Sequence, residues 1–143
     1  MTPRTKTDTI VIHCSATPSD MDIGVEKIKH WHTVDNGWDD IGYHYVVRRS
    51  GELETGREEH RTGSHARQVN GTSIGICMIG GSNKNGDWEN NFNEEQFSTL
   101  KEIVTKLKDK YNIEKVIGHY EVDDVKKCAS FNVKEWLEEN GMV

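Results

Sequence analysis

The chain has 143 residues, with 18 Lys or Arg against 24 Asp or Glu, and its formal charge at pH 7 is -6. One domain is usual at this length, so residues 1–143 are expected to form a single domain. The acidic balance argues against a nucleic-acid partner, because phosphate contacts require clustered Lys and Arg. No apolar run approaches the ~20 residues needed to cross a bilayer, which argues against a membrane protein.

The N-terminal residues and the cysteines indicate the compartment in which the protein is made. Residues 1–6 are polar and lack the apolar core of a signal peptide, so synthesis in the cytoplasm without a signal peptide is expected. The three cysteines, Cys14, Cys77 and Cys128, contain no CxxC pair and do not suggest a disulfide framework. A reducing compartment at synthesis is therefore expected, and a thiolate could still bind a metal there.

The first predicted element is a buried strand that ends in a histidine. Thr9 to Ile12 are four β-branched residues without a charge, which is typical of a strand buried on both faces. His13 follows, and rigid scaffold at the rim of a sheet can hold an imidazole precisely enough for a metal. A hydrogen bond to the backbone is the alternative, and this stretch leaves both open. Cys14 should face the opposite way and belong to the core.

Residues 24–38 have the periodicity of an amphipathic helix, with apolar residues at three- and four-residue spacings. Asn36-Gly37 is a stop signal, since glycine readily adopts the left-handed conformation that follows a helix. His30 and His32 belong to this segment. They are interpreted as packing and surface residues and not as ligands.

A pair of strands joined by a turn at Ser50-Gly51 is predicted over residues 41–47 and 52–55. Regular alternation along the first of them would place Tyr43 and Tyr45 on the same face. Together with residues 24–38, this region therefore predicts a helix followed by a hairpin.

A long segment without periodicity, residues 57–70, is predicted to run over the surface and to line a site. A second buried strand follows over residues 73–79, where Cys77 is interpreted as a small core residue.

The last third of the chain alternates helix, strand and helix. Asn93 is a good N-cap for a helix that runs to about residue 111, and Asn132 can cap a helix over residues 133–139. A short strand is predicted at residues 116–117. Because strands and helices alternate throughout without repeats, the sequence predicts one α/β domain.

Three residues at the ends of predicted elements could bind a metal. His119 follows a short apolar strand as His13 does, and Cys128 lies in a polar stretch where a core role is not expected. Two imidazoles and one thiolate meet the count of three protein ligands in a catalytic zinc site. Spacing of this kind is a weak signal, because no regular pattern defines such a triad.

Six segments together carry a resemblance to one family. They are IHCSAT at residues 12–17, the WH, GW and IGYH motifs within residues 31–44, GSHA at 63–66, SIGIC at 73–77, GHYEV at 118–122, and KKCASF at 126–131. They resemble the zinc-dependent N-acetylmuramoyl-L-alanine amidases, which include small phage lysozymes and share a fold with peptidoglycan recognition proteins. The resemblance covers nearly the whole chain and implies a central mixed β-sheet flanked by helices.

The resemblance implies one zinc ion (Zn2+) per chain, held by His13, His119 and Cys128. The chain departs from the family pattern after the ligand cysteine. Ala129 stands where proline is common, and Asn132 stands where aspartate is common. The first change is expected to loosen the loop that holds the cysteine, and the second to remove an outer hydrogen bond. Neither removes a ligand.

The resemblance also implies catalytic residues. The tyrosine of the Gly-Tyr-His motif matches Tyr43, and the family's lysine two residues before the ligand cysteine matches Lys126 and not Lys127. Tyr43 would orient or deprotonate a metal-bound water and pass a proton to the leaving amine, while Lys126 would stabilise the oxyanion. For His65 in the Ser-His-Ala motif, substrate contact and a purely structural role both stay open.

The implied function is that of a phage endolysin, which cleaves the amide bond between N-acetylmuramic acid and the L-alanine of the peptidoglycan stem peptide. Two alternatives remain. Relatives without the ligand cysteine bind peptidoglycan without cutting it, and Cys14 or Cys128 could instead serve a cysteine hydrolase.

The partner expectations are peptidoglycan, no nucleic acid, no membrane, and a monomer. A phage member of the family also inhibits an RNA polymerase, so a phage RNA polymerase stays open as a further partner. The protein would be stored in the host cytoplasm and reach the periplasm and cell wall through a separate pore-forming protein.

Overall fold

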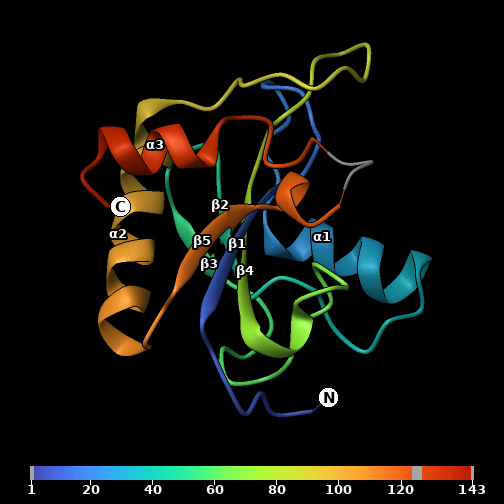
Figure 1. The fold of residues 1–143 in the computed structure, drawn as a ribbon. Helices are drawn as coiled ribbons and strands as arrows, with labels where there is room; N and C mark the ends of the chain where they lie inside the picture. The colour runs from blue at the N-terminus through green and yellow to red at the C-terminus, as the bar shows by residue number, and fades with distance from the viewer. Residues whose placement is uncertain (1, 124–126, 143) are drawn as a thin grey trace.

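The described part of the computed structural model, residues 2–123 and 127–142, is built around one five-stranded mixed sheet (Figure 1). The strands are β1 (Thr9–Cys14), β2 (Tyr45–Val47), β3 (Leu53–Thr55), β4 (Ser73–Met78) and β5 (Lys115–Gly118). Their order is β3-β2-β4-β1-β5, with β3 antiparallel to β2 and the other neighbours parallel. The expected α/β architecture with a mixed sheet is confirmed.

Three α-helices flank this sheet. They are α1 (Val25–His30), α2 (Glu94–Lys110) and α3 (Val133–Glu139). Helices α2 and α3 lie on one side of the sheet and α1 on the other (Figure 1). Both expected caps are present, since the Asn93 side chain accepts a hydrogen bond from the backbone N–H of Gln96, and the Asn132 side chain accepts one from that of Glu135.

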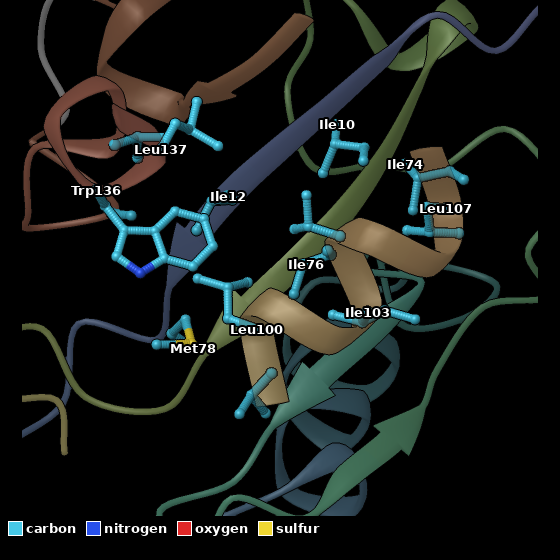
Figure 2. Packing of buried hydrophobic residues seen from close by; sticks show 14 residues of the cluster. Ile10, Ile12, Ile74, Ile76, Met78, Leu100, Ile103, Leu107, Trp136 and Leu137 are labelled. Carbon is cyan, nitrogen blue, oxygen red and sulfur yellow. The ribbon is translucent and has the colours of Figure 1, made fainter. Parts of the chain in front are cut away.

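The larger core cluster fills the space between the sheet and helices α2 and α3. Figure 2 shows the side chains of β1 and β4 meeting those of the two helices. The labelled members are Ile10, Ile12, Ile74, Ile76, Met78, Leu100, Ile103, Leu107, Trp136 and Leu137. A smaller cluster on the α1 side contains Ile28, Ile41, Val46, Cys77 and Ile79. The core position expected for Cys77 is confirmed, and Cys14 is also buried.

The helix predicted over residues 24–38 is wrong in its second half. Helix α1 ends at His30, and residues Trp31–Asp35 continue as a single π-helical turn. Gly37 then takes the expected left-handed conformation with φ of 73°. The same apolar spacing therefore ends in a wider turn, which sequence periodicity does not distinguish from an α-helix.

The strand predicted over residues 41–47 is also too long, because β2 begins only at Tyr45. Tyr45 packs against the larger cluster, whereas Tyr43 packs against the smaller one on the α1 side. The expectation that both tyrosines share a face is thus wrong. Alternation holds only within the ladder, and the chain turns between Gly42 and His44 before joining it.

No helix within residues 2–123 and 127–142 has the length and apolar character needed to cross a membrane.

Candidate metal centre and active site

The residues predicted as metal ligands lie together at the carboxyl ends of the parallel strands β1 and β5. His13 is the penultimate residue of β1, and His119 follows β5 directly. Strands β1 and β5 are parallel, with Ile12 opposite Gly118, so the residues that follow these two positions, His13 and His119, lie side by side. Ligand atoms of His13, His119 and Cys128 all lie within 4.8 Å of one another. The carboxyl ends of parallel strands are a common position for functional sites.

Cys128 is buried and held by the neighbouring backbone. The backbone N–H of Cys14 donates to Cys128 Sγ over 2.8 Å, and the carbonyl oxygen of Cys128 accepts from the N–H of Tyr120 over 2.6 Å. Burial raises the pKa of the Cys128 thiol well above its usual value, and the Cys14 side chain raises it further. A thiolate here therefore needs a cation to compensate its buried charge, which a bound metal provides.

The donor set fits zinc. Two imidazoles and a thiolate are the ligands that this borderline-soft ion accepts, and three protein ligands leave a fourth tetrahedral position for water or substrate. Burial lowers the pKa of His13 well below its usual value, and His65 and His119 lower it further. His13 is thus a neutral imidazole at pH 7, the form that binds a metal. A carboxylate oxygen of Asp123 lies 3.9 Å from His119 Nε2.

Tyr43 lies beside this cluster, with its ring centroid 5.1 Å from that of His13. The preceding residue, Gly42, packs against the backbone of Ser64, where a Cβ would collide with the Ser64 carbonyl oxygen. Burial raises the pKa of the Tyr43 phenol well above 10, and Cys77, Cys128 and Cys14 add to the effect. Tyr43 therefore keeps its proton at neutral pH.

His32 borders the site on the side of α1, a position that sequence reasoning did not assign to it. Its ring centroid lies 5.6 Å from that of Tyr43 and 4.5 Å from that of Trp38. Its Nδ1 accepts a hydrogen bond of 2.9 Å from the backbone N–H of Gly42. His32 thus supports the segment that carries Tyr43. The signal available in the sequence was the Trp31-His32 pair within the family motifs.

His65 contacts a predicted ligand directly. Its Nδ1 lies 2.8 Å from His13 Nε2, and its Nε2 lies 3.2 Å from the hydroxyl oxygen of Ser73. The long segment that carries His65 therefore reaches the metal cluster, as expected of a segment that lines a site. Substrate contact by His65 stays a prediction.

The predicted catalytic lysine, Lys126, lies outside the described residues. Lys127 is described and exposed. Of the two departures from the family pattern, Ala129 is fully buried in the larger core cluster, and Asn132 caps α3 through its side-chain oxygen. Asparagine therefore serves a helix N-terminus here, a position that aspartate serves equally well.

Comparison with known proteins shows the family of the chain. A family model described as N-acetylmuramoyl-L-alanine amidase matches residues 3–130. The endolysin of Klebsiella phage KP32 is 41% identical over 142 residues, which covers 99% of this chain and 93% of that protein. The endolysin of Escherichia phage T7 is 41% identical over 140 residues, which covers 98% of this chain and 91% of that protein.

Solved structures of an amidase and of a peptidoglycan recognition protein have the same fold. The N-acetylmuramoyl-L-alanine amidase LysC from Clostridium intestinale URNW superposes with a TM-score of 0.81 at 27% identity, covering 96% of this chain and 87% of that one. Wild-type Drosophila PGRP-LB superposes with a TM-score of 0.72 at 25% identity, covering 90% of this chain and 81% of that one.

Proposed function

The chain belongs to the N-acetylmuramoyl-L-alanine amidase family, and from this we propose that it is a zinc-dependent endolysin. It hydrolyses peptidoglycan at the amide bond between N-acetylmuramic acid and the L-alanine of the stem peptide. The observation that carries the zinc dependence is the convergence of His13, His119 and Cys128 within 4.8 Å. One zinc ion per chain bound to these three residues leaves one position for water or substrate.

The chemistry requires both an activated water and stabilisation of the charge that develops on the carbonyl oxygen, because an amide is a poor electrophile. Bound zinc supplies both, since it lowers the pKa of its water to ~7 and polarises the carbonyl. The protonated phenol of Tyr43 suits it to orienting the water and to passing a proton to the leaving amine. Lys126 is proposed, from the family motif, to place a positive charge near the oxyanion.

Two other functions receive less support from the site. A peptidoglycan-binding module needs no thiol, yet the Cys128 thiol lies within 4.8 Å of the ligand atoms of His13 and His119. A cysteine hydrolase using Cys14 would need an accessible thiol, whereas the Cys14 sulfur is buried and lies 3.6 Å from the Ser130 hydroxyl. Cys128 could serve as a nucleophile only if its thiolate formed without a metal, which burial opposes.

The test is to incubate the purified protein with cell-wall sacculi, with and without EDTA. Exposure of a new alanine amino terminus, its loss in EDTA and its recovery with added zinc would support the zinc amidase. Activity that survives EDTA would indicate a cysteine hydrolase, and release of reducing sugar ends would indicate a glycosidase. Binding without any product would indicate the binding module.

We further propose that a separate pore-forming protein releases this endolysin from the host cytoplasm. Expression of the chain alone should then leave cells turbid, and addition to membrane-permeabilised Gram-negative cells should clear them. Lysis by the chain alone, without permeabilisation, would contradict the proposal. A monomeric state and an interaction with a phage RNA polymerase stay predictions.

A further inference from the structure

A chain of hydrogen bonds runs from a backbone carbonyl to the predicted ligand His13. The hydroxyl oxygen of Ser73 lies 2.7 Å from the carbonyl oxygen of Val69 and 3.2 Å from His65 Nε2. His65 Nδ1 in turn lies 2.8 Å from His13 Nε2. The direction of every link follows from the first one, because a carbonyl oxygen can only accept.

The Ser73 hydroxyl has a single proton, and it donates this proton to Val69 O. The same oxygen can therefore only accept from His65, so Nε2 of His65 carries a proton. The His65 ring packs against the backbone of Gly63 and Gly75 and faces the imidazoles of His13 and His44, where a neutral ring is favoured because like charges would repel. A neutral imidazole with its proton on Nε2 has a bare Nδ1, which can only accept.

The consequence for His13 is a defined tautomer. Its Nε2 faces the bare Nδ1 of His65 over 2.8 Å, so this nitrogen must carry the proton and donate. In a neutral His13 ring, a proton on Nε2 leaves Nδ1 with a lone pair. The nitrogen that is not engaged by His65 is therefore the one prepared to bind a metal.

Two glycines hold the His65 ring in this position. A Cβ at Gly75 of β4 would lie 2.5 Å from His65 Cγ, and a Cβ at Gly63 would lie 2.7 Å from His65 Cδ2. The ring is thus packed directly against the backbone of the strand next to β1. This contact explains why glycine interrupts the bulky residues of β4.

His44, whose ring centroid lies 5.7 Å from that of His65, is engaged independently. Its Nδ1 accepts from the backbone N–H of Gly75 over 3.0 Å, and its Nε2 lies 2.7 Å from the carbonyl oxygen of Arg61. Both nitrogens are therefore used by the backbone. His44 is buried whereas His65 is half-buried, and within residues 2–123 and 127–142 His44 makes no hydrogen bond to a predicted ligand, which makes it a neighbouring histidine for comparison.

We propose that His65 and Ser73 are positioning residues that fix the tautomer of His13, so that His13 presents its Nδ1 to zinc. The part concerning zinc rests on the proposed function, whereas the tautomer is a property of the chain without metal. Outer partners of this kind orient metal-bound histidines and change metal affinity by about 10–100-fold when they are removed.

The first test is nitrogen NMR of the metal-free protein with 15N-labelled histidines. We expect a proton bonded to His13 Nε2, with a coupling across the hydrogen bond to His65 Nδ1. A proton on His65 Nδ1, or one on His13 Nδ1, would overturn the proposal whether or not the protein is a zinc enzyme.

The second test is zinc affinity, measured by competition with a chelator. His65→Phe keeps a ring and removes both nitrogens, and we expect it to weaken zinc binding by about 10–100-fold. His65→Asn retains an acceptor oxygen near the position of Nδ1 and should restore most of the affinity. Ser73→Ala, two hydrogen bonds from the metal, should weaken binding by about 10-fold or less.

His44→Phe is the control for loss of a neighbouring histidine, and it should lower the melting temperature without the same loss of zinc affinity. Equal zinc affinity in folded His65→Phe and in the wild type would overturn the positioning role while leaving the zinc amidase intact. Absence of zinc binding in the wild type would instead contradict the proposed function. If His65→Phe does not fold, the NMR measurement on the wild type still decides the tautomer.

Discussion

The two faces of the sheet differ in what the same strands present to them. Toward α2 and α3, strands β1 and β4 present Ile10, Ile12, Ile74 and Ile76, which belong to the larger core cluster (Figure 2). Toward α1, the intervening positions of the same strands include His13, Gly75 and Cys77. One face holds the larger core cluster, and the other holds the smaller cluster together with the metal cluster and the tyrosine beside it.

This difference shows that alternation along a strand separates the side chains that stabilise the larger core from those that form the candidate site. Ile12 and His13 are adjacent in sequence, yet one belongs to the larger apolar cluster and the other to the candidate metal centre. Helices α2 and α3 bury apolar side chains on one side of the sheet, and the opposite side holds buried polar groups such as His13 and His44, which are costly unless paired. Substitutions on the two faces should therefore have separable effects.

The largest effect is expected on the metal face. Cys128→Ala removes a zinc ligand, and we expect loss of zinc together with a fall in turnover of about 10³-fold or more. Zinc content and product release from sacculi measure the two effects. Cys77→Ala is the matched control, since Cys77 is a buried thiol of the smaller cluster and should leave zinc in place. Full zinc occupancy in Cys128→Ala would refute the ligand assignment.

Tyr43→Phe should separate binding zinc from using it. The substitution removes the hydroxyl beside the metal cluster and keeps the ring, so zinc should remain while turnover falls by about 10²–10³-fold. Lys126→Ala is expected to behave in the same way, with Lys127→Ala as its neighbouring control. Impairment of Lys127→Ala with normal turnover in Lys126→Ala would show that the other lysine of the pair is catalytic.

Ile12→Val tests the opposite face of the same strand. It removes one methylene from a fully buried side chain, so the free energy of unfolding should fall by about 0.5–1.5 kcal/mol. Zinc affinity and turnover should be unchanged, because the side chain points away from His13. Denaturant unfolding and chelator competition measure the two quantities. A clear loss of zinc affinity would contradict the separation of the two faces.

The smallest effect, on the free energy of unfolding, is expected from a substitution of Glu59. Glu59, in the segment that leads to His65, accepts hydrogen bonds from Lys110 and Tyr111 at the end of α2 and from Tyr45 of β2. Burial alone would raise the pKa of Glu59, but these three hydrogen bonds outweigh it and lower the pKa to about 2.

A carboxylate whose pKa is lower in the folded state stabilises the protein above its usual pKa of 4.5 and loses this contribution as the pH falls toward 2. After discounting for solvent screening, the contribution is on the order of 1 kcal/mol. Glu59→Gln should reduce the dependence of unfolding free energy on pH between these values, as measured by denaturant unfolding at a series of pH values. An unchanged pH profile would contradict the role of this carboxylate.

Local signals in the sequence were enough for most of the elements. The cap residues Asn93 and Asn132 and the left-handed Gly37 mark boundaries that the structure confirms, because capping and positive φ depend on a few contiguous residues. The family motifs, spread over the chain, predicted which histidines and cysteine come together. Their spacing alone could not, since no local rule connects residues so far apart.

Only the tertiary structure decided how the site is held. The turn that moves Tyr43 to the α1 side, and the packing of His65 against Gly75, depend on segments that meet only in the folded chain. The tautomer inferred for His13 follows from Val69, Ser73 and His65 in succession. Hydrogen-bond direction is a property of which groups face one another, and periodicity along a chain carries no information about that.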